Sequence, residues 1–148
     1  MMNRGLEKIV AVLISTMNID PDEFSPLTSP SRAASLGYAI AGWLYMLRRQ
    51  KNTRIQAVAS ILTIGMALWL RINPVEVAVL VLTITMVWMA EFLNAAVEAV
   101  VNVVSPDLHP MAKVGKDVAS AAVLLGVVAS VIVGLLILGP PLLRKLSG

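Results

Sequence analysis

The sequence predicts an all-α membrane protein in which three transmembrane helices follow an amphipathic surface helix. The chain has 148 residues, of which 57% are hydrophobic and 14% are charged, whereas soluble domains carry about 25% charged residues. Its mean hydropathy is +0.80. Residues 55–70 and 118–143 contain no Asp, Glu, Lys or Arg, and uncharged runs of about this length match the hydrocarbon core of a bilayer.

The N-terminal region, 1–31, is predicted to be an extension and linker. Residues 6–17 are amphipathic and 18–31 are rich in Pro, Ser and Asp, which is typical of a flexible linker. Glu7 and Lys8 begin the amphipathic stretch and no small-residue cleavage site follows it, so we expect no signal peptide and a retained N-terminus.

A membrane domain is predicted over 32–148. Its surface helix, at 33–50, is apolar with glycines and ends in a basic run, a composition suited to the headgroup region. Transmembrane helices are expected at about 54–71, 75–104 and 117–143. The turn at Asn73-Pro74 and the prolines at 106 and 110 separate them.

The distribution of Lys and Arg predicts the orientation. Nine of the twelve lie in the N-terminal region or between the second and third spans, against Arg71, Arg144 and Lys145 on the other side. By the positive-inside rule the N-terminus is expected in the cytoplasm, which makes this a multi-pass protein of the cell (inner) membrane. Because three helices enclose little, we also expect an oligomer.

Several classes of function are disfavoured. The chain has no cysteine, which excludes disulfides, thiolate zinc sites and cysteine nucleophiles. The net charge of +3 is not gathered into a basic stripe, so nucleic acid is not an expected partner. Neither the P-loop nor the kinase glycine-rich loop is present.

A polar face crosses the second predicted span. Glu91, Asn94, Glu98 and Asn102 recur at helical spacing and therefore share one side of the helix. Ionisable groups at membrane depth are costly and usually functional. Two other interpretations remain: a hydrogen-bonded seam between helices of an oligomer, or a relay that conducts protons or ions.

A second polar cluster follows this helix. His109, Lys113, Lys116 and Asp117 lie on the same expected side of the membrane as the end of the polar face. Carboxylates with a lysine at a membrane boundary suit Mg²⁺ and a polyphosphate, hence phosphoryl transfer. Alternatively, Lys116 and Asp117 only begin the third helix and His109 is an ordinary loop residue.

Two strings in this region resemble the prokaryotic diacylglycerol kinase and undecaprenol kinase family. They are EFLNAAVEAVV at 91–101 and KDVASAAV at 116–123, which give E-x-x-N-x-x-x-E and K-D-x-x-S-A-A in the family's order with His between them. SLGYAIAG at 35–42 is similar to the family's surface helix, and 52–55 to its Asn-x-Arg-Ile. The resemblance covers about residues 35–140.

The resemblance implies a homotrimer of three-helix subunits that uses ATP and Mg²⁺ to phosphorylate a membrane lipid hydroxyl, diacylglycerol or undecaprenol, at the cytoplasmic face. In that family pattern Glu91 is the general base, Asn94 holds the reacting region, and Glu98 binds the metal beneath the phosphates of ATP. The remaining implied contacts are with ATP for Tyr38, His109, Lys116 and Asp117, and with the lipid for Ser120 and Glu91.

Three positions depart from the family pattern. A second metal-binding glutamate is replaced by Gln50, an aspartate by Asn102, and an N-terminal arginine by Ser31, with Arg32 adjacent. A neutral amide is a weaker ligand for a hard cation than a carboxylate, so we expect weakened magnesium binding. The alternative function is a catalytically weakened relative that binds lipid or nucleotide as a structural or regulatory membrane protein.

Overall fold

The computed structural model describes residues 31–105 and 109–147, and these residues form four helices and no strand. The helices are α3 (Arg32–Arg49), α4 (Lys51–Leu70), α5 (Pro74–Val104) and α6 (Pro110–Ser147). The described chain divides into two units, 31–42 and 43–147. The predicted amphipathic stretch at 6–17 and the linker up to residue 30 lie outside the described residues.

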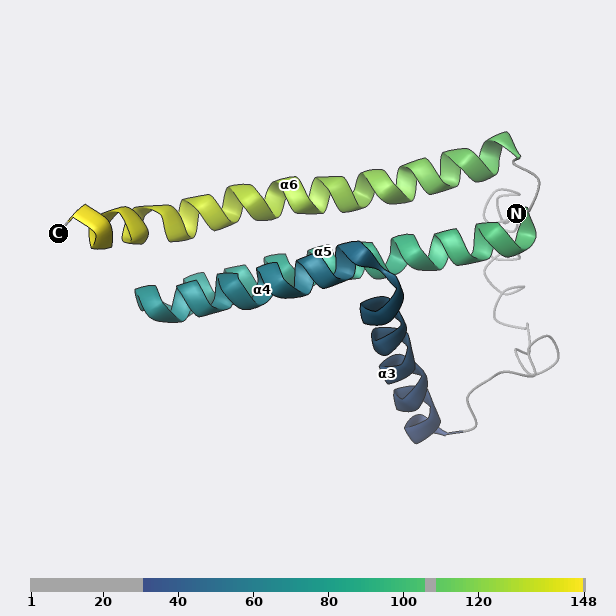
Figure 1. Cartoon of the computed structure of the whole chain (residues 1–148), viewed down its shortest axis with the longest axis horizontal. Helices are drawn as coiled ribbons and strands as arrows, with labels where there is room; N and C mark the ends of the chain where they lie inside the picture. The colour runs from purple at the N-terminus through teal and green to yellow at the C-terminus, as the bar shows by residue number, and fades with distance from the viewer. Residues whose placement is uncertain (1–30, 106–108, 148) are drawn as a thin grey trace, which may run out of the picture. The chain divides into compact units, whose positions relative to one another are not determined.

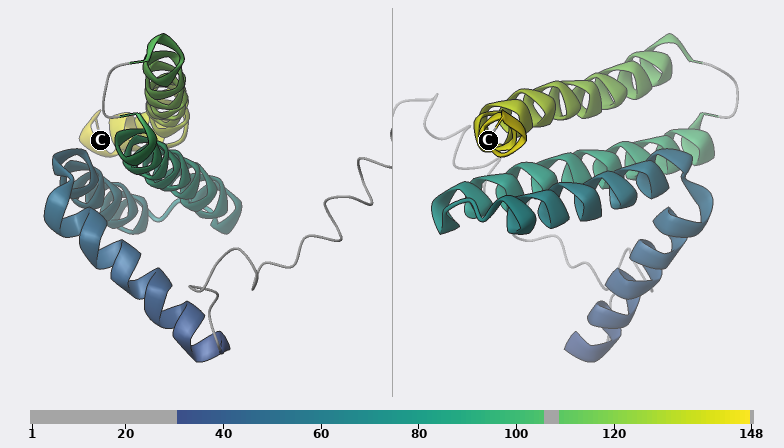
Figure 2. Two further views of the ribbon diagram at one scale, coloured as in Figure 1. Left: turned by 90° about the vertical axis from the view of Figure 1, so that its right-hand side faces the viewer. Right: turned by 60° about the vertical axis from the view of Figure 1, so that its left-hand side comes forward.

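Three of these helices, α4, α5 and α6, are long and apolar enough to cross a membrane. They run alongside one another and reverse direction at each connection, as the two further views also show (Figure 1, Figure 2). The predicted fold class, three transmembrane helices after a preceding helix, is therefore confirmed.

The connection between α4 and α5 is built by backbone caps. Arg71 ends α4 in the left-handed conformation (φ 53°, ψ 44°), where its N–H reaches the carbonyls of the last turn. Asn73 then caps α5: its side chain accepts a hydrogen bond from the Glu76 N–H, and the Glu76 carboxylate accepts one from the Asn73 N–H, both at 3.0 Å. Pro74 occupies the first helical turn, where its missing N–H has no consequence.

The tightest apolar packing lies near this connection. Ala67, Leu80 and Leu138, one from each spanning helix, are almost fully buried. Between helices in lipid, van der Waals packing replaces the hydrophobic effect as the attractive force. These contacts hold the end of the bundle opposite to Asn102 and Lys116.

Helix α6 extends beyond the predicted third span at both ends. It begins at Pro110 and continues through Pro140 and Pro141 to Ser147. At its start, the ring nitrogen Nδ1 of His109 accepts a hydrogen bond from the Met111 N–H at 3.2 Å, which satisfies a free N–H of the first turn. Hydropathy marks the membrane-crossing portion, whereas the backbone caps decide where the helix begins.

Candidate active site between α5 and α6

Glu91 is the buried acidic residue of the polar face on α5. Its side chain is 8% exposed, and within residues 31–105 and 109–147 its carboxylate forms neither a hydrogen bond nor an ion pair. An ionisable group in such a place is expensive unless it has a partner or a function. The carboxylate therefore has no partner among the described residues with which an incoming group would have to compete.

Asn94, one turn further along α5, is the centre of a hydrogen-bonded chain. Ser120 Oγ of α6 donates to Asn94 Oδ1 at 3.4 Å, and Asn94 Nδ2 donates to Glu98 Oε1 at 3.4 Å. An amide can accept on its oxygen and donate from its nitrogen at the same time. Asn94 thus joins the serine of one helix to the carboxylate of the other, and it orients Glu98.

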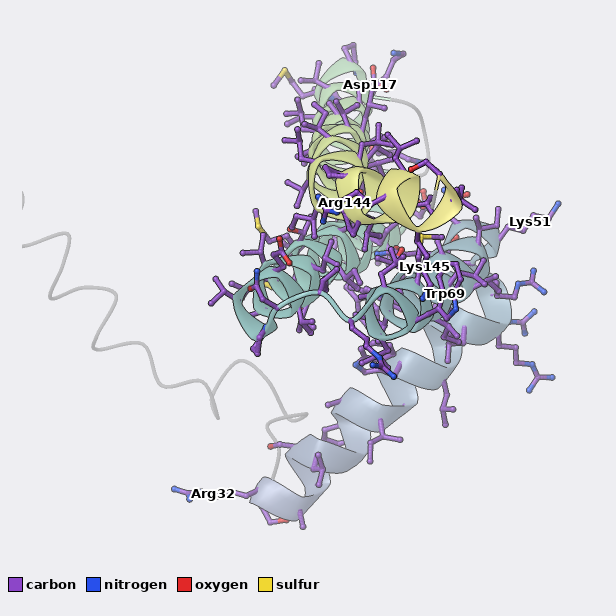
Figure 3. The ribbon with its side chains drawn as sticks, turned by 90° about the vertical axis from the view of Figure 1, so that its left-hand side faces the viewer. Arg32, Lys51, Trp69, Asp117, Arg144 and Lys145 are labelled. Atoms are coloured by element: carbon purple, nitrogen blue, oxygen red, sulfur yellow. The ribbon has the colours of Figure 1, made fainter. Side chains whose placement is uncertain are left out.

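Lys116 makes the second polar link between the helices. Its Nζ donates to Asn102 Oδ1 at 3.3 Å. Lys116 belongs to the second polar cluster, and Asn102 is the last residue of the polar face. Asp117 faces another partner, since it forms an exposed ion pair with Lys113 on its own helix. The structure thus brings Lys116 to the polar face and leaves Asp117 on the outer side of α6, where Figure 3 labels it.

Two predicted ATP-binding residues are not brought to this face by the contacts of the structure. His109 is exposed and serves the start of α6, where its N–H donates to Ser105 Oγ at 3.4 Å. Tyr38 is 62% exposed and belongs to the separate unit 31–42. Their roles toward ATP stay predictions.

The carboxylates of the candidate site bear on whether it can hold magnesium. Among the described residues no three His, Asp or Glu side chains gather around one point. Mg²⁺ commonly takes only one or two protein carboxylates and completes its shell with substrate phosphates and water. Glu98, half-buried and oriented by Asn94, fits that pattern as a single carboxylate beside a nucleotide, whereas Gln50 offers a neutral oxygen.

Comparison with known proteins decides the family. The family model of prokaryotic diacylglycerol kinase matches residues 37–138. The chain belongs to the prokaryotic diacylglycerol kinase family. The predicted class, a membrane kinase with transmembrane helices, is thereby confirmed.

The individual relatives are named either diacylglycerol kinase or undecaprenol kinase. A diacylglycerol kinase of Synechocystis sp. is 42% identical over 116 residues, which are 78% of this chain and 66% of that protein. A diacylglycerol kinase of Escherichia coli is 31% identical over 96 residues, 65% of this chain and 79% of its own length. An undecaprenol kinase of Bacillus subtilis is 33% identical over 95 residues, 64% and 77% respectively.

The sequence did not predict the aromatic cluster that lies beside Glu91 in this member of the diacylglycerol kinase family. Trp43 of α3 lies 4.7 Å from Trp88 and 5.0 Å from Phe92, measured between ring centroids. Trp88 Nε1 also donates to Ser60 Oγ of α4 at 3.2 Å. Trp88 and Phe92 are four residues apart, so their spacing could have predicted that these two rings share a helical face. No pattern in the sequence pairs either ring with Trp43.

A groove of about 440 Å³ lies among α4, α5 and α6 of this family member, and its lining includes Gln56 and Val87. The Ser60, Thr83 and Ser130 hydroxyls in the lining each donate to a carbonyl of their own helix. By contrast, both polar atoms of the Gln56 amide are buried without a partner among the described residues. Because Val87 precedes Glu91 by about one turn, the groove approaches the polar face.

Proposed function

We propose that the protein is a lipid kinase that transfers the γ-phosphoryl group of ATP to the hydroxyl of diacylglycerol or undecaprenol. The observation that carries this proposal is the arrangement on α5: Glu91 is buried without a partner among the described residues, and it precedes an Asn94–Glu98 pair joined to Ser120 of α6. The relatives named diacylglycerol kinase and undecaprenol kinase supply the two acceptors.

In the proposed reaction, Glu91 accepts the proton of the lipid hydroxyl while the hydroxyl oxygen forms a bond to the γ-phosphorus. The bond between that phosphorus and the β,γ-bridging oxygen breaks, and ADP leaves with the electron pair. A carboxylate can act as the base only if it is free to accept the proton, and Glu91 has no competing hydrogen bond among the described residues. Asn94 keeps the Glu98 carboxylate in one orientation.

Glu98 would hold Mg²⁺ together with the phosphates of ATP, and Gln50 is the weaker candidate ligand. Bound there, the ion would supply positive charge that offsets the negative charge of the phosphate oxygens. Lys116 would contact a phosphate oxygen, which requires that its bond to Asn102 be exchanged. Tyr38, His109 and Asp117 are proposed around the nucleotide, and Ser120 near the lipid.

The lipid tail is proposed to lie in the groove among α4, α5 and α6. The lining is mostly apolar, and the Gln56 amide in it is buried with neither its donor nor its acceptor paired among the described residues. A buried amide without partners destabilises a protein by about 1–3 kcal/mol. A hydroxyl or ester oxygen of the acceptor would relieve that penalty.

The proposal extends to the subunit number and the membrane placement of the protein. The three spanning helices leave much apolar side-chain surface uncovered, which suits a lipid environment. The homotrimer is proposed from the resemblance to the family and not from this surface. The N-terminus is proposed to be cytoplasmic. Cross-linking in native membranes, with a trimeric product expected, would test the subunit number.

The decisive experiment is a kinase assay in mixed micelles with radiolabelled ATP and a panel containing diacylglycerol and undecaprenol. Glu91→Gln should lower phospholipid formation at least about a hundredfold, since a general base contributes roughly 10²–10⁴ to the rate. Glu76→Gln is the matched control, because it lies on the same helix and its amide oxygen can still cap Asn73. Equal activity of Glu91→Gln and the unchanged protein would contradict the proposed base.

Gln50 and Asn102 favour a second candidate, a relative with weakened catalysis that binds lipid or nucleotide. Magnesium titration of the assay should show a lower requirement for Gln50→Glu, because a carboxylate binds the ion more strongly. Asn102→Asp should convert the contact with Lys116 into an ion pair. No labelled lipid from the unchanged protein at any magnesium concentration would decide for the second candidate.

A further inference from the structure

Four cations gather where α3 ends and α4 begins. They are Arg48, Arg49, Lys51 and Arg54, and all four side chains are exposed. The sequence contains no Asp or Glu between Glu23 and Glu76. This junctional cluster therefore carries four positive charges with no acidic residue nearby in the chain.

The folded chain does not compensate these charges. Within residues 31–105 and 109–147 the one ion pair joins Lys113 to Asp117, and no member of the junctional cluster donates a side-chain hydrogen bond. The macrodipole favours Arg48 and Arg49 at the end of α3. It disfavours Lys51 and Arg54 in the first turn of α4, which has neither an acidic residue nor a side-chain cap.

The position of the cluster points to the membrane surface. Lys51 begins a helix that is apolar enough to cross the bilayer, so the cluster lies where that helix leaves the hydrocarbon. Trp43 and Tyr45, which are 47% and 58% exposed, precede it, and such aromatic side chains are enriched at the headgroup level. Figure 3 shows the Lys51 side chain pointing away from the spanning helices.

We propose that the junctional cluster is a docking surface for anionic phospholipids, whose headgroup phosphates pair with Arg48, Arg49, Lys51 and Arg54. Guanidinium groups form paired hydrogen bonds to phosphate oxygens. Each cation near an anionic membrane surface strengthens association by about fivefold. The proposal does not depend on the proposed kinase activity, because it concerns the lipids that surround the protein and not the acceptor.

The test uses Trp43 as a local probe, since it precedes the cluster on the same helix. The full chain carrying Trp69→Phe and Trp88→Phe is reconstituted in phosphatidylcholine vesicles with a minor share of brominated phosphatidylglycerol or brominated phosphatidylcholine. Bromine quenches tryptophan at short range, so the ratio of quenching reports the enrichment of each lipid. We expect about tenfold enrichment of the anionic lipid, lost in about 0.5 M salt, where the Debye length is near 4 Å.

The triple substitution Arg48→Gln, Arg49→Gln and Lys51→Gln should remove most of the preference, because Arg54 is then the one cation of the cluster that remains. The matched control, Arg48→Lys, Arg49→Lys and Lys51→Arg, keeps the charges and should retain most of it. In a companion protein whose remaining tryptophan is Trp69, at the other end of α4, the triple substitution should leave the quenching unchanged.

Two results would overturn the proposal. One is equal quenching of Trp43 by both brominated lipids at low salt in the protein with an intact cluster. The other is an unchanged lipid preference in the triple variant. If the binding of ATP is weakened in that variant as well, the cations are assigned to the nucleotide. Loss of kinase activity is not part of the readout, so failure of the proposed function would not affect the result.

Discussion

Replacing Trp88 by phenylalanine removes one hydrogen bond between α4 and α5 and leaves most of the ring packing around it in place. Trp88 Nε1 donates to Ser60 Oγ at 3.2 Å, and Ser60 Oγ in turn donates to the Gln56 carbonyl at 2.8 Å. A phenylalanine ring loses the donor but can remain against Trp43 and Phe92, whose centroids lie 4.7 Å and 6.1 Å from that of Trp88.

The expected loss of stability is small. A neutral hydrogen bond contributes about 1 kcal/mol net, and interhelical bonds in membranes average about 0.6 kcal/mol. Ser60 keeps its bond to the Gln56 carbonyl in the variant. We therefore expect Trp88→Phe to lower the free energy of unfolding by about 0.5–1 kcal/mol. Trp88→Ala should lower it by about 2–4 kcal/mol, because two aromatic pairs worth about 0.5–1.5 kcal/mol each are also lost.

The assay is unfolding by sodium dodecyl sulfate in mixed micelles, followed by far-ultraviolet circular dichroism because the substitution removes a fluorophore. A double-mutant cycle with Ser60→Ala isolates the bond from the other effects of each change. The coupling free energy should be about 0.6 kcal/mol. A coupling indistinguishable from zero, or a Trp88→Phe variant as unstable as Trp88→Ala, would refute this account of the contact.

Two further predictions concern the other contacts between helices. Lys145→Met removes a hydrogen bond to the Trp69 carbonyl (3.1 Å) and a contact of the ammonium with the Trp69 ring (4.1 Å) (Figure 3). The same unfolding assay should show a loss of about 1 kcal/mol. An equally large loss in Arg144→Met, whose side chain has no partner among the described residues, would contradict this expectation. Gly126→Ala places a methyl group 3.7 Å from Val87 Cγ2, an ordinary contact, so the gain in helix propensity should stabilise the protein by about 0.5–1 kcal/mol. Destabilisation would show that α5 and α6 pack more tightly there than these distances indicate.

Much of the candidate site could be predicted from the sequence because it lies on one helix. Glu91, Asn94 and Glu98 share a face through their spacing alone, and the structure shows the last two in direct contact. The sequence also placed Lys116 near this face but not its partner, Asn102. Asp117, its neighbour in sequence, faces Lys113 instead, because successive residues of a helix point in directions about 100° apart.

The remaining features depend on contacts between separate elements. Trp43 and Trp88 are far apart in the chain, and no spacing rule relates them. In the sequence, Gln56 is an ordinary polar residue near the start of a span. Its amide is buried without a partner among the described residues because of how the three helices pack. The start of α6 at Pro110 was likewise set by a local cap from His109, not by hydropathy.

The amino-acid sequence by itself determined the number of spanning helices, the polar face of α5 and the charge at each end of the bundle. These properties follow from hydropathy and helical periodicity, which sum along the chain without reference to other segments. Tertiary structure decided that Ser120 reaches Asn94, that Trp88 bonds to Ser60, and that Glu91 is buried without a partner among the described residues. Such pairings depend on the rotation and depth of one helix against another, and single-residue properties do not encode either.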